Sequence, residues 1–187
     1  MKSAIKQPWI TIGYELFAQE GPKGLKIEVL ARKMNKNKSS FYHLFADIEI
    51  FISELLEHHI EQSKAIAQQS SLCQNIHPDL IQVLFNIKED ILFNKHLRIH
   101  RDNPAYNKCI VDAYKIIKDG MLPILIEVLE LSSKKQLASQ IFDLAIDNFY
   151  LQSTDKNLTN EWLSNYFNEI IKMISAMKIS NQWQNER

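Results

Sequence analysis

Residues 27–45 read IEVLARKMNKNKSSFYHLF, and this stretch decides how the rest of the chain is interpreted. Its apolar residues recur at helical spacing on both sides of a polar break at residues 35–38. They are Ile27, Leu30, Ala31 and Met34 before the break, and Phe41, Leu44 and Phe45 after it. Two helices of under ten residues are not stable alone, so they must pack on each other and on a third helix. The pattern predicts a helix-turn-helix, an arrangement that reads DNA.

The polar break has the chemistry of a turn. Asn35 and Asn37 both tolerate left-handed backbone, which a tight connection between helices often requires. Asn37 is also a good N-cap, because its side chain can accept a hydrogen bond from the backbone amides that open the second helix.

A longer stretch, residues 16–51, extends the motif. The segments LFAQEG and LKIEVLARKMNKNKSSFYHLFADIEIF resemble the N-terminal domain of TetR/AcrR-type bacterial transcriptional repressors. That family carries an Ile-Ala pair in its second helix and a Tyr and a Phe three residues apart at the end of its recognition helix. Here Leu30 and Ala31 stand for the pair, and Tyr42 and Phe45 for the two aromatic residues. Agreement in spacing over about 35 positions is more specific than an isolated motif.

The chain departs from the family pattern at two places. Asn35, Lys36 and Asn37 replace the usual Gly-Val-Ser of the turn, and Ile48 replaces a lysine that usually follows the closing Phe. The asparagines keep the turn and cap chemistry. Lys36 replaces a core valine, so its methylenes are expected to lie along the core with the ammonium toward solvent or a phosphate. Ile48 removes one expected phosphate contact.

The resemblance implies an all-α protein of about nine helices. Residues 1–47 would form the helix-turn-helix DNA-binding domain, and residues 48–187 would bind a ligand and dimerise. It further implies a homodimer that binds a near-palindromic DNA operator and releases it when a small-molecule effector binds, acting as a repressor. No cofactor is expected. A helical binding or scaffold protein without operator recognition is the alternative, and a small all-α enzyme is a third.

Composition and charge fit this interpretation. The four glycines and five prolines lie between helical patterns, and no Gly-rich loop is present to cradle phosphates. Residues 1–47 contain eight Lys/Arg and four Asp/Glu, while residues 48–187 contain fourteen and eighteen. The net charge of zero therefore divides into a basic part that carries the motif and an acidic remainder, as in a DNA-binding head on an acidic body.

The N-terminal residues predict no signal peptide, because Glu15 and other polar residues interrupt any apolar run. Residues 121–131 are too few to span a bilayer and include Glu127 and Glu130. Cys73 and Cys109 lack metal-ligand spacing. These features predict a reduced cytoplasmic protein without a membrane segment.

The remaining pattern predicts helices at residues 4–19, from Asp47 onward, at 79–93, at 95–101 and from Asn103, where Pro104 takes the first helical position. Gly21 is expected to end the first helix. Gly120 and Pro123 are expected to kink or break the helix that begins near Asn103, with a pocket beside the break.

Three sets of candidate residues follow. The exposed face of the recognition helix and its neighbours supply groups for phosphates and base edges: Lys26, Lys36, Asn37, Lys38, Ser39, Ser40, Tyr42 and His43. The last two helices are apolar over a wide arc, which favours burial against a second subunit. The expected dimer-interface residues are Leu137, Ile141, Leu144, Trp162, Tyr166, Phe167, Ile170 and Ile174. Aromatic residues with a few polar partners form the expected effector pocket: Phe93, His96, Tyr106, Tyr114, Phe142, Asn148 and Phe149.

Other sites find less support. His96 and His100 lie one helical turn apart, a spacing that can bind zinc, but Arg98 and Arg101 flank them and no further acidic or Cys ligand is apparent from the pattern. No metal site is therefore predicted. The sequence has no nucleophile elbow, HExxH or CxxC, so an enzyme is not expected.

Overall fold

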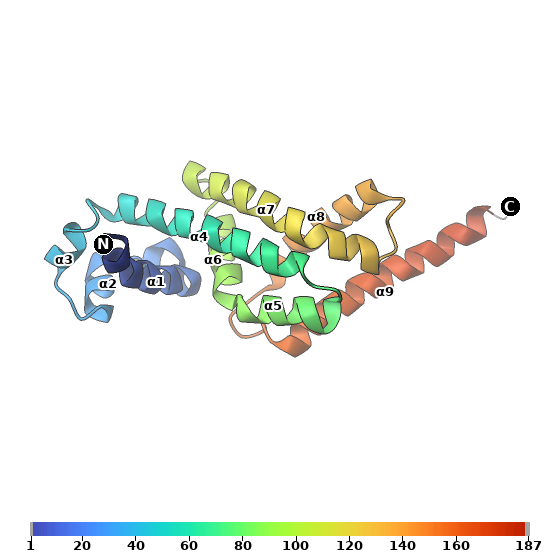
Figure 1. The fold of residues 1–187 in the computed structure, drawn as a ribbon, viewed down its shortest axis with the longest axis horizontal. Helices are drawn as coiled ribbons and strands as arrows, with labels where there is room; N and C mark the ends of the chain where they lie inside the picture. The colour runs from blue at the N-terminus through green and yellow to red at the C-terminus, as the bar shows by residue number, and fades with distance from the viewer. Residues whose placement is uncertain (1, 186–187) are drawn as a thin grey trace. The chain divides into compact units, whose positions relative to one another are not determined.

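The computed structural model describes residues 2–185, with side-chain exposure given for residues 4–176. Over these residues the chain is all-helical, as predicted (Figure 1). The helices are α1 (Lys2–Glu20), α2 (Ile27–Lys33), α3 (Lys38–Tyr42), α4 (Ile48–Ser71), α5 (Ile81–Asn86), α6 (Lys88–Ile99), α7 (Pro104–Val128), α8 (Lys135–Gln152) and α9 (Asn160–Asn185). Two short helical turns, η1 (Gly21–Gly24) and η2 (Ile76–Leu80), connect α1 to α2 and α4 to α5.

Local signals place several helix ends where the sequence predicts them. Gly21 ends α1 with a φ of 69°, a left-handed conformation that glycine adopts without a steric cost. Asp47 caps α4, because its Oδ1 accepts a hydrogen bond of 2.8 Å from the Ile50 amide. Asn103 caps α7 in the same way, accepting a bond of 2.9 Å from the Ala105 amide.

Two predicted helix boundaries are wrong. The helix expected over residues 79–93 divides at Ile87 into α5 and α6, and α6 continues to Ile99. The acids Glu89 and Asp90 fall in the first turn of α6, where they complement the helix dipole. The expected break at Gly120 and Pro123 is also absent, since α7 runs unbroken through both residues.

The helices form two compact units. Unit 1 consists of residues 1–65 and 88–116, and unit 2 consists of residues 66–87 and 117–187. The units therefore interleave along the sequence, and helices α4 and α7 each contribute to both. The division of function at residue 47 remains a prediction.

Unit 1 contains two aromatic clusters on the helices that surround α1. Phe41 and Phe45 pack on Phe51 of α4, with ring centroids 5.3 and 4.8 Å from it, and Trp9 of α1 packs edge-on against Phe41. The second cluster joins α1 to α6, because Phe93 lies 4.2 Å from Tyr14 and 4.3 Å from Phe17. These rings are almost wholly buried, so both clusters are core.

A chain of buried hydrogen bonds links α1, α4 and α6 in unit 1, and no pattern in the sequence predicts it. Arg98 Nε donates to Asn94 Oδ1 at 3.1 Å, and Asn94 Nδ2 lies 3.1 Å from His59 Nε2. His59 Nδ1 lies 2.6 Å from the Tyr14 hydroxyl, which also donates to Asp90 Oδ1 at 2.7 Å. This chain of hydrogen bonds runs from the Arg98 guanidinium at one end to the Asp90 carboxyl group at the other.

Arg98 fixes the direction of every bond in this chain. Because a guanidinium only donates, Asn94 must accept through its oxygen and donate through its nitrogen. His59 therefore accepts at Nε2 and carries its proton on Nδ1, which it donates to the Tyr14 oxygen. The Tyr14 hydroxyl proton then goes to Asp90. Each buried group is satisfied with His59 neutral.

We expect unit 1 to lose stability in mild acid because of His59. Burial lowers the pKa of His59 from 6.5 to about 3. The unfolded chain then binds a proton that the folded chain does not, so the free energy of unfolding falls as the pH drops below 6.5, by at most about 1.4 kcal/mol per pH unit. Burial also lowers the pKa values of His58 and His96, and these shifts act in the same direction.

Urea denaturation at pH 7, 6 and 5 measures this effect. Asp90 opposes it, since burial raises the pKa of that carboxyl group above its ordinary 3.8, and the folded protein then gains stability as the pH falls through the raised pKa. His59→Gln should be less stable at pH 7 and should show a flatter pH dependence, while His77→Gln, at an exposed position, should keep the wild-type slope. Equal slopes for the wild type and His59→Gln would contradict the assignment.

Unit 2 packs α5 and α8 against α9. Tyr166 of α9 lies edge-on to Phe149 of α8, with centroids 5.4 Å apart, and Trp162 stacks on Tyr166. Gly120 of α7 packs directly on the backbone of α4, because a Cβ atom built on it would lie 2.5 Å from the Ala67 carbonyl oxygen. Gly120 thus permits a close approach of two helices and does not interrupt one.

Candidate functional site

The turn between α2 and α3 is closed by backbone hydrogen bonds. The Lys36 amide donates to the Ala31 carbonyl at 2.9 Å, and the Asn35 amide donates to the Arg32 carbonyl at 3.1 Å. This pair of bonds is a Schellman motif, which needs a residue of positive φ between the helix end and the next segment. Asn35 supplies it with a φ of 51°. The turn chemistry predicted for Asn35 is confirmed.

Asn37 caps α3, also as predicted. Its backbone is extended, and its Oδ1 accepts bonds of 2.9 Å from both the amide and the hydroxyl of Ser40. The bond from the Ser40 amide satisfies one of the amides at the start of α3 that have no partner within the helix. The Oδ1 of Asn37 is thus committed to the cap.

The candidate DNA-contacting residues lie on the outside of this motif. All are exposed except Ser40, which is half-buried. Tyr42 is 54% exposed, although its neighbour Phe41 is fully buried and anchors α3. The Tyr42 side chain is therefore accessible to a partner, while Phe41 holds α3 in place.

Lys38 at the first position of α3 forms an ion pair with Glu28 of α2. Both side chains are more than half exposed, so solvent screens the pair. The hydrogen bond from Lys38 lowers the pKa of Glu28. The Glu28 carboxylate lies beside Lys38, which is expected to contact a DNA phosphate, so its negative charge would repel an anionic partner.

The expectation that Lys36 lies along the core is wrong. Lys36 is exposed, and its contribution to the fold is the backbone bond that closes α2. The Schellman turn carries this residue past the end of α2, which leaves its side chain outside. Its ammonium adds to the positive charge of Lys26 and Lys38. Ile48 is half-buried in the first turn of α4.

The residues predicted for an effector pocket are divided between the two units. Phe93, His96 and Tyr106 belong to unit 1, where Phe93 and Tyr106 pack on Phe17 in the core. Tyr114 also belongs to unit 1, and Asn148 is exposed on α8. Of the predicted pocket residues, Phe142 and Phe149 line the cavity described next, and the use of the full set by an effector remains a prediction.

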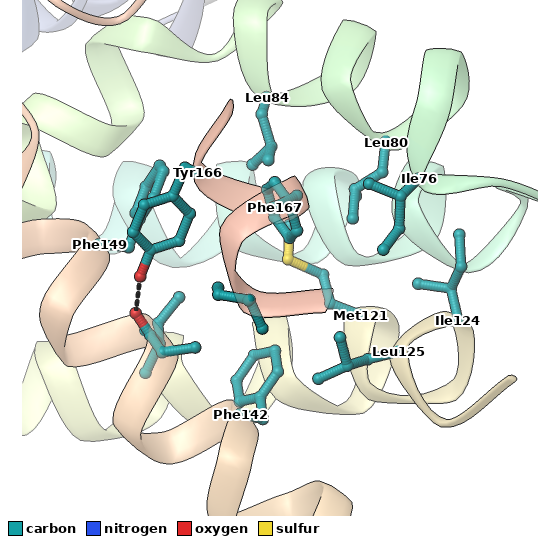
Figure 2. Close-up of a pocket in the computed structure, with 13 residues that line it drawn as sticks. Ile76, Leu80, Leu84, Met121, Ile124, Leu125, Phe142, Phe149, Tyr166 and Phe167 are labelled. Atoms are coloured by element: carbon teal, nitrogen blue, oxygen red, sulfur yellow. Dashed lines mark hydrogen bonds between the residues drawn. The ribbon is translucent and has the colours of Figure 1, made fainter. Parts of the chain in front are cut away.

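Phe142 and Phe149 do line a cavity inside unit 2. Its volume is about 50 Å³, and its walls come from η2, α5, α7, α8 and α9 (Figure 2). The other lining residues are Ile76, Leu80, Leu84, Met121, Ile124, Leu125, Ala145, Ile146, Tyr166, Phe167 and Ile170. The Tyr166 hydroxyl donates to the Ala145 carbonyl at 2.6 Å, and burial raises the pKa of Tyr166 to about 12. The described lining is thus uncharged.

An open groove of about 960 Å³ runs along α8 and α9. Among the residues predicted for a dimer interface, Leu137 and Leu144 line it at 43% and 75% exposed. Ile141 also lines the groove, and Met173, which was not among the predicted residues, adds a side chain that is 52% exposed. Exposed apolar side chains gathered at one groove are typical of an interaction surface.

The other residues predicted for the dimer interface are less exposed than Leu137 and Leu144, and some of them line the cavity or the core of unit 2. Tyr166 and Ile174 are buried but form part of the groove wall, as does Ile170. Phe167 lines the cavity, and Trp162 packs on Tyr166 and Phe149. Their wide apolar arc is therefore explained partly by the core of unit 2.

His96 of α6 packs against the C-terminal end of α1. Its Nδ1 is close to Gly21, where a built Cβ would lie 2.7 Å from it. Within the described residues, no group of three or more His, Cys, Asp or Glu side chains is placed to hold a metal ion. In the same part of the chain, no helix combines the length and apolar character needed to cross a membrane.

No protein-family model and no curated protein matches this sequence. Among solved structures, a protein of Mesorhizobium loti MAFF303099 that has been proposed to be a TetR-family transcriptional regulator matches with a TM-score of 0.63 and 13% identity. The match covers 94% of this chain and 97% of the other. The resemblance seen in residues 16–51 is thereby confirmed for the fold, and this chain has the fold of that TetR-type structure.

Proposed function

We propose that this protein is a cytoplasmic DNA-binding transcriptional regulator, which acts as a homodimer and represses transcription until a small molecule binds. The main support is the α2–α3 motif, whose capped five-residue helix presents Lys38, Ser39 and Tyr42 to solvent while Phe41 anchors it from below. In a dimer, two such helices would enter successive major grooves about 34–36 Å apart on a near-palindromic operator.

The exposed groups suit distinct contacts with a duplex. Lys26, Lys36 and Lys38 can meet phosphates, and the Tyr42 hydroxyl can donate to a phosphate oxygen. Ser39 and His43 can reach base edges, where a hydroxyl or an imidazole donates or accepts. The effector would bind unit 2 and favour a dimer whose α3 helices no longer match the operator.

Single substitutions in α3 should weaken DNA binding without unfolding the protein. Lys38→Ala and Tyr42→Ala each remove one contact at an exposed position, so each should lower the affinity for DNA. Lys38→Ala should also lower the salt dependence of binding by about one unit of slope, because it removes a cation, whereas the neutral Tyr42→Ala should leave that slope unchanged. Glu28→Gln should strengthen binding, because it removes a carboxylate that pairs with Lys38. Gel shifts at several salt concentrations on the DNA upstream of the coding sequence measure all three.

Lys156→Ala is the matched control, since Lys156 is an exposed lysine of unit 2. It should bind as the wild type does. Specific binding at nanomolar concentration in low salt supports the proposal. Absence of specific binding below micromolar concentration would reject it in favour of a helical binding protein that keeps the fold without reading an operator.

A further inference from the structure

The cavity of unit 2 has walls that select against charged and polar ligands. Its described lining is aliphatic or aromatic, and the hydroxyl of Tyr166 is already engaged by the Ala145 carbonyl. A buried water needs two to four polar partners, which these walls do not offer. An ionised group would lose its hydration without gaining a partner. The site therefore suits an uncharged apolar molecule.

The resting cavity is small for such a molecule. It measures about 50 Å³, whereas an engineered apolar cavity that takes a benzene ring measures about 150 Å³. A ring-sized ligand must therefore move part of the wall. Met121 is the most adaptable wall residue, because its unbranched side chain changes rotamer at little cost, and its sulfur faces Phe167 of α9 (Figure 2).

The wall that would move is shared with the exposed groove. Ala145, Tyr166 and Ile170 line the cavity on one side and the groove on the other. The Tyr166–Ala145 hydrogen bond ties α9 to α8 at this wall. An expansion of the cavity toward α9 would thus change the groove that carries Leu137 and Leu144.

We propose that this cavity binds a small uncharged apolar molecule of up to one ring, and that its occupation alters self-association at the α8–α9 groove. The inference rests on the proposed function, which supplies the dimer. It adds the chemical class of the ligand and the groove through which the ligand would control self-association. Leu84, from α5, lines the cavity but not the groove, so it separates ligand binding from assembly.

Benzene and benzoate are the probes. In a protein labelled with ¹³C at the methionine methyl groups, benzene should shift the Met121 signal saturably, and benzoate should not. Met121→Leu assigns the signal. Leu84→Phe fills the cavity and should abolish the benzene shift, whereas Leu72→Phe makes the same change at a position 76% exposed and outside α8 and α9, and should leave the shift intact. Equal responses to both probes, or no saturable response, would overturn the ligand class.

Sedimentation at several protein concentrations tests the link to assembly. Benzene should change the dimer dissociation constant about fivefold or more in the wild type and in Leu72→Phe, and not in Leu84→Phe. A benzene-bound protein with an unchanged dissociation constant would overturn the link. A chain that is monomeric at every concentration would overturn both the link and the proposed dimer, while the Met121 titration would still decide whether the cavity takes an apolar ligand.

Discussion

Replacing Phe51 by alanine is expected to lower the free energy of unfolding by about 3–5 kcal/mol. The Phe51 ring is fully buried, and it contacts both Phe41 and Phe45 edge-on. Its loss leaves a cavity under α3, a helix too short to hold its conformation without that support. Urea denaturation followed by circular dichroism measures the change in stability.

The neighbouring Ile50 supplies the control, since it lies on the same helix and is 47% exposed. Ile50→Ala should change the free energy of unfolding by no more than about 0.5 kcal/mol. DNA binding by Phe51→Ala should also fall, because α3 would lose its anchor, and it should fall little in Ile50→Ala. Comparable losses of stability in the two variants would show that the buried Phe51 ring is not what supports α3.

Gly120→Ala is expected to destabilise the protein by about 1–3 kcal/mol, and the sign of the effect is what makes it informative. Alanine is a better helix former than glycine by about 1 kcal/mol, so intrinsic propensity alone would predict a gain. The new Cβ would lie 2.5 Å from the Ala67 oxygen and 2.6 Å from the Ala67 Cα. Those are backbone atoms, so α4 and α7 would have to separate.

Asp119→Ala, one residue away and exposed, should change the free energy of unfolding by no more than about 0.5 kcal/mol. Thermal and urea denaturation of both variants measure these changes in the free energy of unfolding. A Gly120→Ala protein more stable than the wild type would mean that helix propensity governs this position and that the close approach to Ala67 is not needed.

The α2–α3 motif was predictable because its signals are local. The positive φ of Asn35, the cap by Asn37 and the burial of Phe41 each follow from residue type and spacing over a few positions. Such features act within one turn of a helix and leave a readable trace in sequence. The exposure of the side chains on α3 follows from the same pattern.

The rest of the chain was less predictable because its features arise from contacts between distant segments. Gly120 suggested an interruption, but its role depends on Ala67, which lies on another helix. Phe93 and His96 suggested a pocket, but Phe93 packs on Tyr14 and Phe17, about 75 residues away in sequence. The buried chain of bonds through His59 likewise joins three helices and follows no short motif.

Selection of binding sites from a random duplex library tests the central claim, operator reading by α3, most directly. The operator sequence need not be known for this experiment. The account predicts enrichment of one near-palindromic motif with half-sites centred about 10–10.5 base pairs apart, or a multiple of that spacing. A protein that carries both Lys38→Ala and Tyr42→Ala should enrich no motif. Failure of the folded wild-type protein to enrich any sequence would contradict the account.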